Sequence, residues 1–400
     1  MRQIKTTEYN KTARINPFSL LSQLHLILPL LIIFFGNARA ATENNRPVLL
    51  LGQSCALSGP AKNLGLKMRA GLQAAIAEIN DAGGIKGRTV HLRSKDDGYE
   101  PDRAIKNTLE LIRDDQVFML IGEVGTPTSK AVIPLVEQYR IPFFAPLTGA
   151  ELLRSPGNSY VVNIRAGYYQ EMESLVAYLT DSLHLKQISC FYQNDSYGFA
   201  GLEGIQLALA KRNLKLVSTG SYERNTVAVM GSLQEIYRKS PEAVILVGTY
   251  AACAEFIKLS KAKQPGRRIY GNISFVGTES LKDALGAYGE DVIVSQVVPF
   301  PWDAGISLVR EYQSAMDKYQ RNNPLGFISL EGYIAGKLFA SIAEAVPGQL
   351  TREKFIQTMW RIGRFDLGGV VLHFDENHQG MGTVELSRIY PTIQKLTTND

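Results

Sequence analysis

The sequence predicts an α/β protein with two lobes, each built around a doubly wound parallel sheet. From Val48 onward, short apolar runs alternate with longer stretches of helical spacing, a pattern typical of strand–helix units. The alternation begins again after residues 161–165, which indicates a second unit of similar design. The chain has 400 residues, 45% of them hydrophobic, so it is too long for one compact core and too apolar for disorder.

Residues 1–40 have the layout of a secretory signal peptide. Basic residues come first, an apolar run follows at 26–35, and Ala38 and Ala40 supply the small residues of a cleavage site. We expect cleavage after Ala40 and export of the rest of the chain. An uncleaved membrane anchor is the alternative, but the apolar run is shorter than the roughly 20 residues that a bilayer span needs.

The charge of the chain gives no sign of a nucleic-acid partner. The formal net charge is +5, but most of the excess lies in the predicted signal peptide, which carries Arg2, Lys5, Lys11, Arg14 and Arg39. No block of clustered Lys and Arg remains in the rest of the sequence. We therefore expect no binding to nucleic acid or to an anionic membrane surface.

The strands expected in the first unit are short apolar runs that end at a loop. They cover residues 48–51, 90–92, 117–121 and 142–144. The helices between them are longer and carry apolar residues at helical spacing. They cover residues 68–79, 101–113 and 128–139, the last despite Pro134.

The second unit repeats this design. Its expected strands are 188–192, 216–218, 243–247 and 274–276, and its expected helices are 170–183, 201–212, 233–239 and 254–262. Helices at 308–319, 330–345 and 351–360 follow, with a turn-rich, strand-like tail at 368–390. Ligands of such sheets bind at the carboxyl ends of the strands, so the loops after the strands are the informative ones.

Motifs of the common enzyme classes are absent from the sequence. The segment 332–337 is one residue short of a phosphate-binding loop and is followed by Leu338, where a hydroxyl should hold magnesium. Gly198, Gly201 and Gly204 do not have the spacing of a dinucleotide-binding fingerprint. We expect that the protein is not an enzyme and uses no cofactor.

Two further groups of residues were weighed as metal or disulfide sites. His373 and His378 flank two acidic residues, but this segment has ordinary turn chemistry, and we expect no metal there. Cys55, Cys190 and Cys253 are odd in number, so one disulfide framework cannot use all of them. Cys190 lies in an apolar run and is expected to be a buried, unpaired thiol.

Several short motifs follow one another in an order that resembles the leucine/isoleucine/valine-binding proteins of branched-chain amino-acid ABC transporters. They are residues 58–60, 80–87, 96–97, 121–122 and 146–152, and later 275–279 and 329–333. Each is weak alone, but in this order they are specific to the type I periplasmic-binding fold. The resemblance covers almost the whole chain after the signal peptide.

The resemblance implies where the lobes begin and end. The N-terminal lobe would comprise residues 46–165 plus 299–366, and the C-terminal lobe residues 166–298 plus 367–400. The chain would cross between the lobes three times, near Arg165, near Pro299 and near Phe365.

The resemblance also implies a function. It indicates a periplasmic solute-binding protein, a monomer, that captures an amino acid or a similar small carboxylate by closing its lobes and delivers it to an ABC transporter permease. The alternative is a ligand-sensing subunit for a membrane sensor kinase or chemoreceptor. The exact ligand stays open, because no motif marks the pocket for its side chain.

The ligand-binding residues are implied by position in the family's motifs. Thr126 in the loop after the third strand, with Leu147, Thr148 and Gly149 after the fourth, would hold a carboxylate. Tyr197 and Tyr250 match the family's aromatic residues, and Glu279 matches the acid that pairs with the ligand's amine. A buried carboxylate needs several charge-assisted hydrogen bonds, which loops at helix N-termini can offer. The alternatives are a helix cap for Thr126 and a solvated loop charge for Glu279.

The sequence departs from the family pattern at two positions. Leu64 stands where the family has an aromatic residue after its Ser-Gly-Pro motif. Gly125 stands where the family has a cysteine, so Cys55 lacks that counterpart. The identity of the ligand and the family's disulfide therefore stay open.

Overall fold

The computed structural model describes residues 46–155, 157–264, 266–374 and 380–396. The predicted signal peptide and its cleavage site after Ala40 lie outside the described residues. So do Asp375, Glu376 and His378, which belong to the segment where no metal site is expected. Within the described ranges, no helix is long and apolar enough to cross a membrane.

The first sheet has five strands in the order β2-β1-β3-β4-β5, and all its ladders are parallel. The strands are β1 (Val48–Cys55), β2 (Thr89–Asp96), β3 (Leu120–Ile121), β4 (Phe143–Phe144) and β5 (Val161–Val162). β1 pairs with β2 along its whole length, from Val48 opposite Thr89 to Cys55 opposite Asp96. Because the strands are parallel, their carboxyl ends meet at one edge, where the predicted ligand loops begin.

Six helices pack with this sheet, and together they form the N-terminal lobe. They are α2 (Lys62–Asp81), α3 (Pro101–Arg113), α4 (Thr126–Tyr139), α10 (Ser307–Tyr319), α11 (Phe327–Ala345) and α12 (Arg352–Ile362). α11 lies directly against α2, and the approach is close because Gly71 has no side chain. A Cβ there would lie 1.8 Å from the carbonyl oxygen of Ser329. α12 is anchored by Phe355, whose ring lies 5.6 Å from that of Phe144.

The second sheet has seven strands in the order β14-β13-β10-β9-β8-β6-β7. They are β6 (Ile188–Gln193), β7 (Thr219–Tyr222), β8 (Ala243–Val247), β9 (Ile269–Asn272), β10 (Val292–Gln296), β13 (Glu385–Arg388) and β14 (Gln394–Lys395). Strands β6 to β10 are parallel to one another. β13 and β14 come from the strand-like tail and add antiparallel edge strands.

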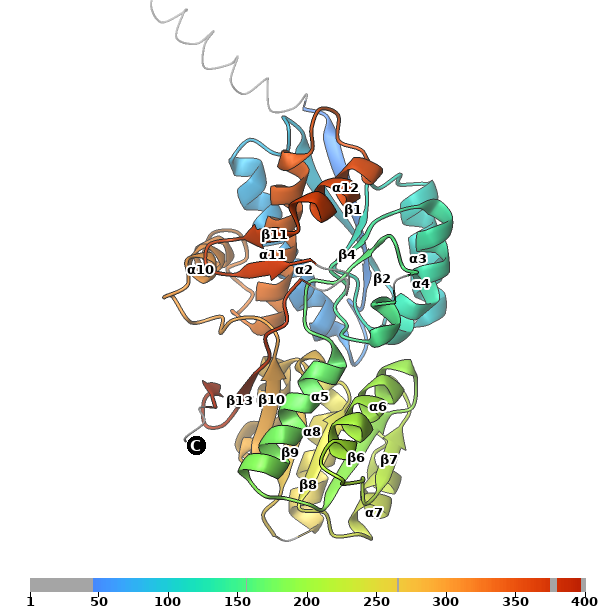
Figure 1. Cartoon of the computed structure of the whole chain (residues 1–400), viewed down its shortest axis with the longest axis vertical. Helices are drawn as coiled ribbons and strands as arrows, with labels where there is room; N and C mark the ends of the chain where they lie inside the picture. The colour runs from blue at the N-terminus through green and yellow to red at the C-terminus, as the bar shows by residue number, and fades with distance from the viewer. Residues whose placement is uncertain (1–45, 156, 265, 375–379, 397–400) are drawn as a thin grey trace, which may run out of the picture. The chain divides into compact units, whose positions relative to one another are not determined.

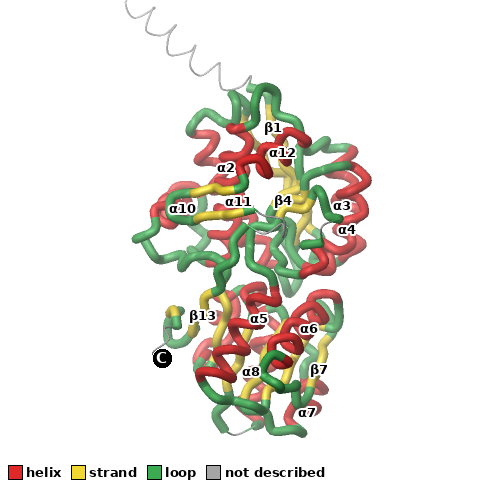
Figure 2. Tube along the Cα trace, viewed as in Figure 1, coloured by secondary structure: helices red, strands yellow, loops and turns green. Residues whose placement is uncertain are grey.

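The helices of the C-terminal lobe cover this second sheet. They are α5 (Tyr168–Ala177), which continues as a π-helical turn at Tyr178–Ser182, and α6 (Ser196–Ala210), α7 (Met230–Tyr237), α8 (Tyr250–Lys263) and α9 (Thr278–Leu285). Figure 1 and Figure 2 show α5 and α6 over the same face of the sheet. Alternate residues of β8 belong to different cores: Ile245 packs with the α5 and α6 side, whereas Val244 and Leu246 pack with α7, α8 and α9. A sheet buried on both faces is expected of a doubly wound fold.

Some expected elements differ from the observed ones. Residues 216–218 precede β7 rather than forming it, and residues 274–276 form a 3-10 turn directly after β9. The turn is apolar because it is buried, which is why it resembled a strand in the sequence. β10 was not predicted. β3 is shorter than the apolar run at 117–121, because pairing with β4 is confined to its last two residues.

The two sheets are joined by three connections, and Phe365, near which the third was expected, lies in β11, before the connection into β13. The chain passes from β5 into α5, from β10 into α10, and from the β11 (Arg364–Asp366) and β12 (Val371–His373) hairpin into β13. The exact residue boundaries of the two lobes remain a prediction.

Candidate functional site

The loops after β3 and β4 bring Thr126 and Thr148 together at the carboxyl edge of the first sheet. Their hydroxyl oxygens lie 2.7 Å apart, and both side chains are buried. The Oγ1 of Thr148 also lies 3.3 Å from the hydroxyl of Tyr168 and accepts a hydrogen bond from the Ala150 backbone at 3.3 Å. The two predicted threonines therefore form one cluster of hydroxyl groups.

Thr126 does not cap helix α4. It is the first helical residue, Gly125 occupies the N-cap position, and no side-chain cap bond is found in this described helix. The hydroxyl of Thr128 bonds back to the carbonyl oxygen of Val124 at 2.6 Å. The Thr126 hydroxyl is therefore turned toward Thr148, at the positive end of the α4 dipole.

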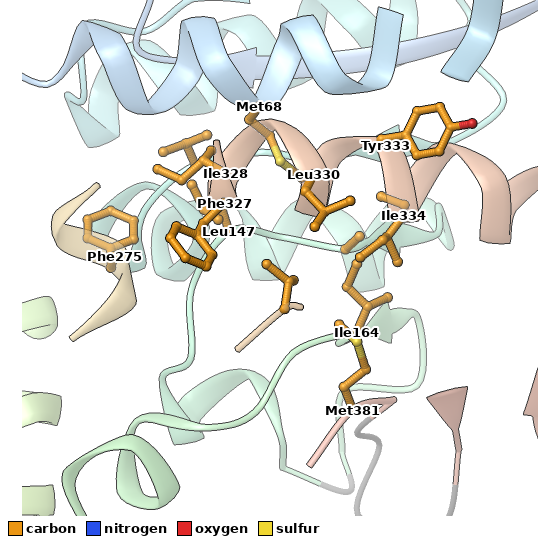
Figure 3. Close-up of a cluster of buried hydrophobic side chains, with 14 of the residues drawn as sticks. Met68, Leu147, Ile164, Phe275, Phe327, Ile328, Leu330, Tyr333, Ile334 and Met381 are labelled. Atoms are coloured by element: carbon orange, nitrogen blue, oxygen red, sulfur yellow. The ribbon is translucent and has the colours of Figure 1, made fainter. Parts of the chain in front are cut away.

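Leu147 and Gly149 hold the shape of this loop. The backbone N–H of Leu147 donates to the carbonyl oxygen of Glu123 at 2.7 Å, so it is already used within the protein. The carbonyl oxygen of Gly149 accepts from the N–H of Tyr168 at 2.7 Å. A Cβ on Gly149 would lie 2.6 Å from the Tyr168 ring, which explains why a glycine is needed. Figure 3 shows the Leu147 side chain in a buried hydrophobic cluster with Phe275 and Phe327.

Tyr197 belongs to a group of four buried aromatic rings, which we call the aromatic cluster: Tyr99, Tyr168, Tyr197 and Phe275. The ring of Tyr197 lies 5.7 Å from Tyr168 and 4.7 Å from Phe275. The ring of Tyr99 lies 6.2 Å from Phe275. Through Tyr168, this cluster reaches the hydroxyls of Thr148 and Thr126.

Sequence reasoning missed Tyr99 and Tyr168. Tyr99 lies in the loop directly after β2, so a search of every loop at a strand's carboxyl end would have found it. Tyr168 begins α5 just after the first connection between the sheets. No local pattern distinguishes it from an ordinary core tyrosine.

Tyr250 lies apart from the aromatic cluster. It begins α8, is partly buried, and makes a hydrogen bond with the backbone of Asn63 on α2. Burial raises the pKa of its hydroxyl, and the bond with Asn63 partly offsets that rise. The structure therefore places Tyr250 on a contact between the lobes.

Glu279 also lies on a contact between the lobes. Its side chain is nearly buried at the start of α9. Oε1 accepts a hydrogen bond from the Phe327 backbone at 2.8 Å, and Oε2 lies 3.3 Å from the Lys67 ammonium. Asn63 donates to the neighbouring Ser280 at 3.3 Å. Glu279 is neither a solvated loop charge nor an isolated acid.

Leu64, the first departure from the family pattern, lies close to this contact. It is fully buried, and its Cδ2 would be 2.9 Å from a Cβ built on Gly277. Gly277 has a φ of +79°, a conformation that residues with side chains rarely adopt. The leucine thus fills space beside a backbone turn that leads directly into Glu279.

A second set of polar contacts joins the lobes through Arg224 and Asn225, which follow β7. Arg224 pairs with Glu100 at 2.8 Å and with Asp195 at 3.1 Å. Asn225 donates to Glu100 at 2.7 Å and to the carbonyl oxygen of Gly98 at 3.0 Å. Glu100 and Gly98 belong to the loop between β2 and α3 of the N-terminal lobe.

Two adjacent acids at the end of β2, Asp96 and Asp97, have pKa values shifted in opposite directions. Burial raises the pKa of Asp97 to about 6, although the Tyr99 N–H and the Ser54 hydroxyl donate to its carboxylate. Burial also acts on Asp96, but hydrogen bonds from Ser58, Leu57 and Gly98 outweigh it and lower the pKa to about 2. Asp97 therefore titrates inside the fold, beside the loop that carries Tyr99.

The described cavities do not coincide with the hydroxyl pair. One of about 460 Å³ is lined by Glu279, Trp302 and Ile393, among others. Another, of about 620 Å³, lies along residues 296–300 and contains none of the predicted site residues. Thr126, Thr148 and the aromatic cluster are buried, and none of them lines either of these two cavities.

The three cysteines are buried and free. The prediction for Cys190 is therefore confirmed, and burial raises the pKa of its thiol. Gly125 has a φ of +106°, and a Cβ there would lie 2.2 Å from the Tyr99 ring. The tyrosine thus occupies the space that a side chain at position 125 would need. Among the described residues, no group of three or more His, Cys, Asp or Glu side chains could hold a metal ion.

The comparisons with known proteins agree with this architecture. Residues 50–390 match the model of the periplasmic binding protein family. The chain is 25% identical over 312 residues to the Leu/Ile/Val-binding protein homolog 7 of Brucella abortus, covering 74% of this chain and 77% of that protein. It is 21% identical over 301 residues to the leucine-specific-binding protein of Salmonella typhimurium, covering 74% and 79% of the two chains.

Solved structures show the same fold. The crystal structure of a possible leucine/isoleucine/valine-binding protein from Rhodopirellula baltica has a TM-score of 0.84 and 35% identity, covering 89% of this chain and 98% of that one. A branched-chain amino-acid ABC transporter structure from Thermus thermophilus with bound valine has a TM-score of 0.79 at 17% identity, covering 88% and 96%. The latter likeness shows the fold alone.

The type I periplasmic-binding fold that the sequence predicted is therefore confirmed. The matched family consists of solute-binding proteins, which also confirms that the protein is not an enzyme. With almost the whole described chain covered by the family model, we conclude that this chain belongs to the periplasmic binding protein family.

Proposed function

We propose that this protein captures an amino acid or a similar small carboxylate in the periplasm and delivers it, as a monomer, to an ABC transporter permease. The observation that carries this proposal is the buried pair of hydroxyls, Thr126 and Thr148, 2.7 Å apart at the start of α4. A carboxylate placed between them would exchange one neutral hydrogen bond for two charge-assisted ones, which are roughly twice as strong. The α4 dipole adds a favourable field.

Capture by lobe closure is supported by the contacts that join the lobes. Arg224 with Glu100, and Lys67 with Glu279, connect segments that lie far apart in the sequence. Such contacts form when the lobes close and break when they open, so they can stabilise a ligand-loaded state. A closed and an open form present different surfaces, which is how a permease could select loaded protein.

The names of the relatives support the ligand class. Similar proteins from Brucella abortus and Salmonella typhimurium are named for binding leucine, isoleucine or valine. All three ligands carry a carboxylate, the group that the hydroxyl pair is suited to bind. We therefore assign Thr126 and Thr148 to the carboxylate, with Leu147 and Gly149 shaping the loop and Tyr197 contacting the rest of the ligand.

The proposal is tested by identifying the ligand that the exported protein carries. Native mass spectrometry should show one protein chain with one bound small acid, and denaturation should release that acid for identification. The released compound should bind again in a calorimetric titration of stripped protein. A copurified ligand without any carboxylate, which rebinds with the same affinity to a Thr148→Val variant, would contradict the proposal.

A further inference from the structure

The acid expected to meet the ligand's amine is already engaged within the protein. Glu279 accepts the Phe327 N–H at 2.8 Å and the Lys67 ammonium at 3.3 Å, one on each carboxylate oxygen. Phe327 begins α11 and Lys67 lies in α2, and both helices belong to the N-terminal lobe. Glu279 therefore spans the two lobes and sits at the N-terminus of a long helix, where a negative charge is favourable.

The charge of Lys67 opposes a second cation at this place. The two side chains of the pair are only 14% and 10% exposed, so water screens them little. An ammonium brought to Glu279 would lie within a few Å of the Lys67 ammonium. Like charges at that distance repel, and the carboxylate can offset only one of them.

Two other acids near the aromatic cluster, Asp195 and Asp97, are engaged as well, and Glu123 is buried. Asp195 pairs with Arg224 at 3.1 Å and also accepts from Gln193 at 2.7 Å. Asp97 accepts from Ser54 and from the Tyr99 N–H. Burial and the charge of Asp97 raise the pKa of Glu123, which favours its neutral form. An incoming ammonium would therefore meet Asp195 and Asp97 already paired or hydrogen-bonded, and Glu123 with a pKa that burial raises.

The surroundings of the hydroxyl pair suit an apolar ligand body. The aromatic cluster presents one phenylalanine and three tyrosine rings, all buried. Leu147 adds an aliphatic side chain from the loop after β4 (Figure 3). Apolar walls with a few directed polar groups are typical of small-molecule sites, and they match the apolar body of the ligand proposed below.

We infer that Glu279 is a closure residue that joins the lobes through Lys67 and Phe327, and that the ligand is an apolar monocarboxylate without an α-ammonium group. This inference rests on the proposed function, because it takes carboxylate capture at Thr126 and Thr148 as given. It differs from the role that the family resemblance implies for Glu279.

Matched pairs of ligands test the inference. Stripped protein is titrated calorimetrically with leucine and 4-methylpentanoate, with phenylalanine and 3-phenylpropanoate, and with alanine and propanoate. In the pair that binds best, we expect the acid without the amine to bind at least tenfold more tightly. Equal or tighter binding of the amino acid overturns the inference and leaves the proposed function intact. If neither acid binds in any of the three pairs, the proposed function is overturned as well.

Variants of Lys67 test the physical cause. Lys67→Met removes the cation that pairs with Glu279 and leaves its carboxylate free to bind an ammonium group. The ratio of affinities should therefore shift at least tenfold toward the amino acid of the pair. Lys67→Arg keeps a cation and should keep the wild-type ratio. Lys62→Met, at the exposed start of the same helix, is the matched control and should leave the ratio of affinities unchanged.

The ratio of two affinities in one variant is insensitive to a general loss of stability, so a weakened Lys67→Met protein still gives an answer. Glu279→Gln tests the role of the acid in lobe closure. It should raise the dissociation rates of both ligands of a pair by similar factors, as expected for a residue that closes the lobes. A selective loss of amino-acid binding in Glu279→Gln, or an unchanged ratio in Lys67→Met, overturns the inference.

Discussion

The side chains of Arg224 and Glu100 lie 2.8 Å apart, although 124 residues separate them and they belong to different lobes. Asn225 reaches the same carboxylate at 2.7 Å, and Arg224 also holds Asp195. Two donors from one loop thus converge on the residue that precedes α3. The arrangement is suited to hold the closed form, since the contacts of Arg224 and Asn225 with Glu100 are lost when the lobes separate, whereas the Arg224–Asp195 pair lies within one lobe.

We expect Arg224→Met to weaken ligand binding about threefold to tenfold, mainly through faster dissociation. The effect is modest because the pair is partly exposed and such pairs contribute roughly 1 kcal/mol or less. Stopped-flow dissociation rates measure it directly. Arg238→Met is the control, because Arg238 forms an exposed ion pair with Glu235 at the C-terminal end of α7 and, among the described residues, makes no ion pair with the other lobe. Equal dissociation rates in wild type and Arg224→Met would show that this contact does not hold the closed form.

Removing the Thr148 hydroxyl should weaken carboxylate binding without unfolding the protein. Thr148→Val loses one hydrogen bond to a charged group, which costs about 1.5–3 kcal/mol, or roughly a tenfold to hundredfold rise in Kd. Thr148→Ser retains the hydroxyl and is the control. The valine variant should melt somewhat lower without ligand, because the Ala150 N–H and the Thr126 hydroxyl lose a buried partner, and it should lose most of the upward shift that ligand gives. A ligand-induced shift as large as in wild type would place the carboxylate elsewhere.

The family resemblance implied Thr126 and Thr148 as residues of the proposed carboxylate site. The loops after parallel strands meet at one edge of a sheet, which is why the fold brings these two threonines together. Errors in the predicted ends of the strands and helices did not change which loop follows which strand. The missed strand β10 has the apolar sequence of a buried strand and could have been found by the same rule.

The partners of Glu279 could not be predicted in this way. Lys67 lies 212 residues earlier, and no spacing rule connects a helix residue of one lobe with an acid at the start of a helix in the other. The family motif indicated where Glu279 lies but not what it touches. Tyr168 was missed for a similar reason, because its role depends on a contact with Thr148 that only the fold creates.

Asp97 should make the stability of the protein fall as the pH rises. Its folded pKa of about 6 lies above the ordinary value of 3.8, so between these values the folded state binds more protons than the unfolded state. Its contribution is fully present below pH 3.8 and is lost as the pH rises through 6. The difference corresponds to about 3 kcal/mol, because one pKa unit is about 1.4 kcal/mol.

Urea unfolding of wild type and Asp97→Asn at pH 4 and pH 7 measures this contribution. The asparagine cannot titrate, so the variant should gain roughly 2–2.5 kcal/mol relative to wild type between the two pH values, because the unfolded-state carboxyl is already more than half ionised at pH 4. Asp96→Asn is the neighbouring control. The folded pKa of Asp96 is about 2, so its contribution is lost below this window and its relative stability should change little across it. Parallel pH profiles for wild type and Asp97→Asn would mean that Asp97 is not desolvated as described.

The last prediction concerns Arg165, which lies in the first connection between the lobes. Its guanidinium is 1% exposed and pairs with Glu171 of the C-terminal lobe at 3.3 Å and with Glu331 of the N-terminal lobe at 3.5 Å. Glu171 is held further by the Ser274 N–H at 2.8 Å and the Ser295 hydroxyl at 2.6 Å. One cation thus offsets two buried carboxylates, one from each lobe.

Arg165→Met should lower the free energy of unfolding by about 3–5 kcal/mol at pH 7, because it leaves two buried carboxyl groups without their cation. Burial already raises the pKa of Glu331, and removing the arginine takes away the group that opposes this rise. The loss should therefore be smaller at pH 5, where Glu331 takes up a proton more easily. Arg165→Met with Glu331→Gln should recover part of the stability, while Arg267→Met, at an exposed ion pair, should match wild type. A loss that is the same at both pH values would show that repacking, rather than an unpaired buried charge, determines the stability of this connection.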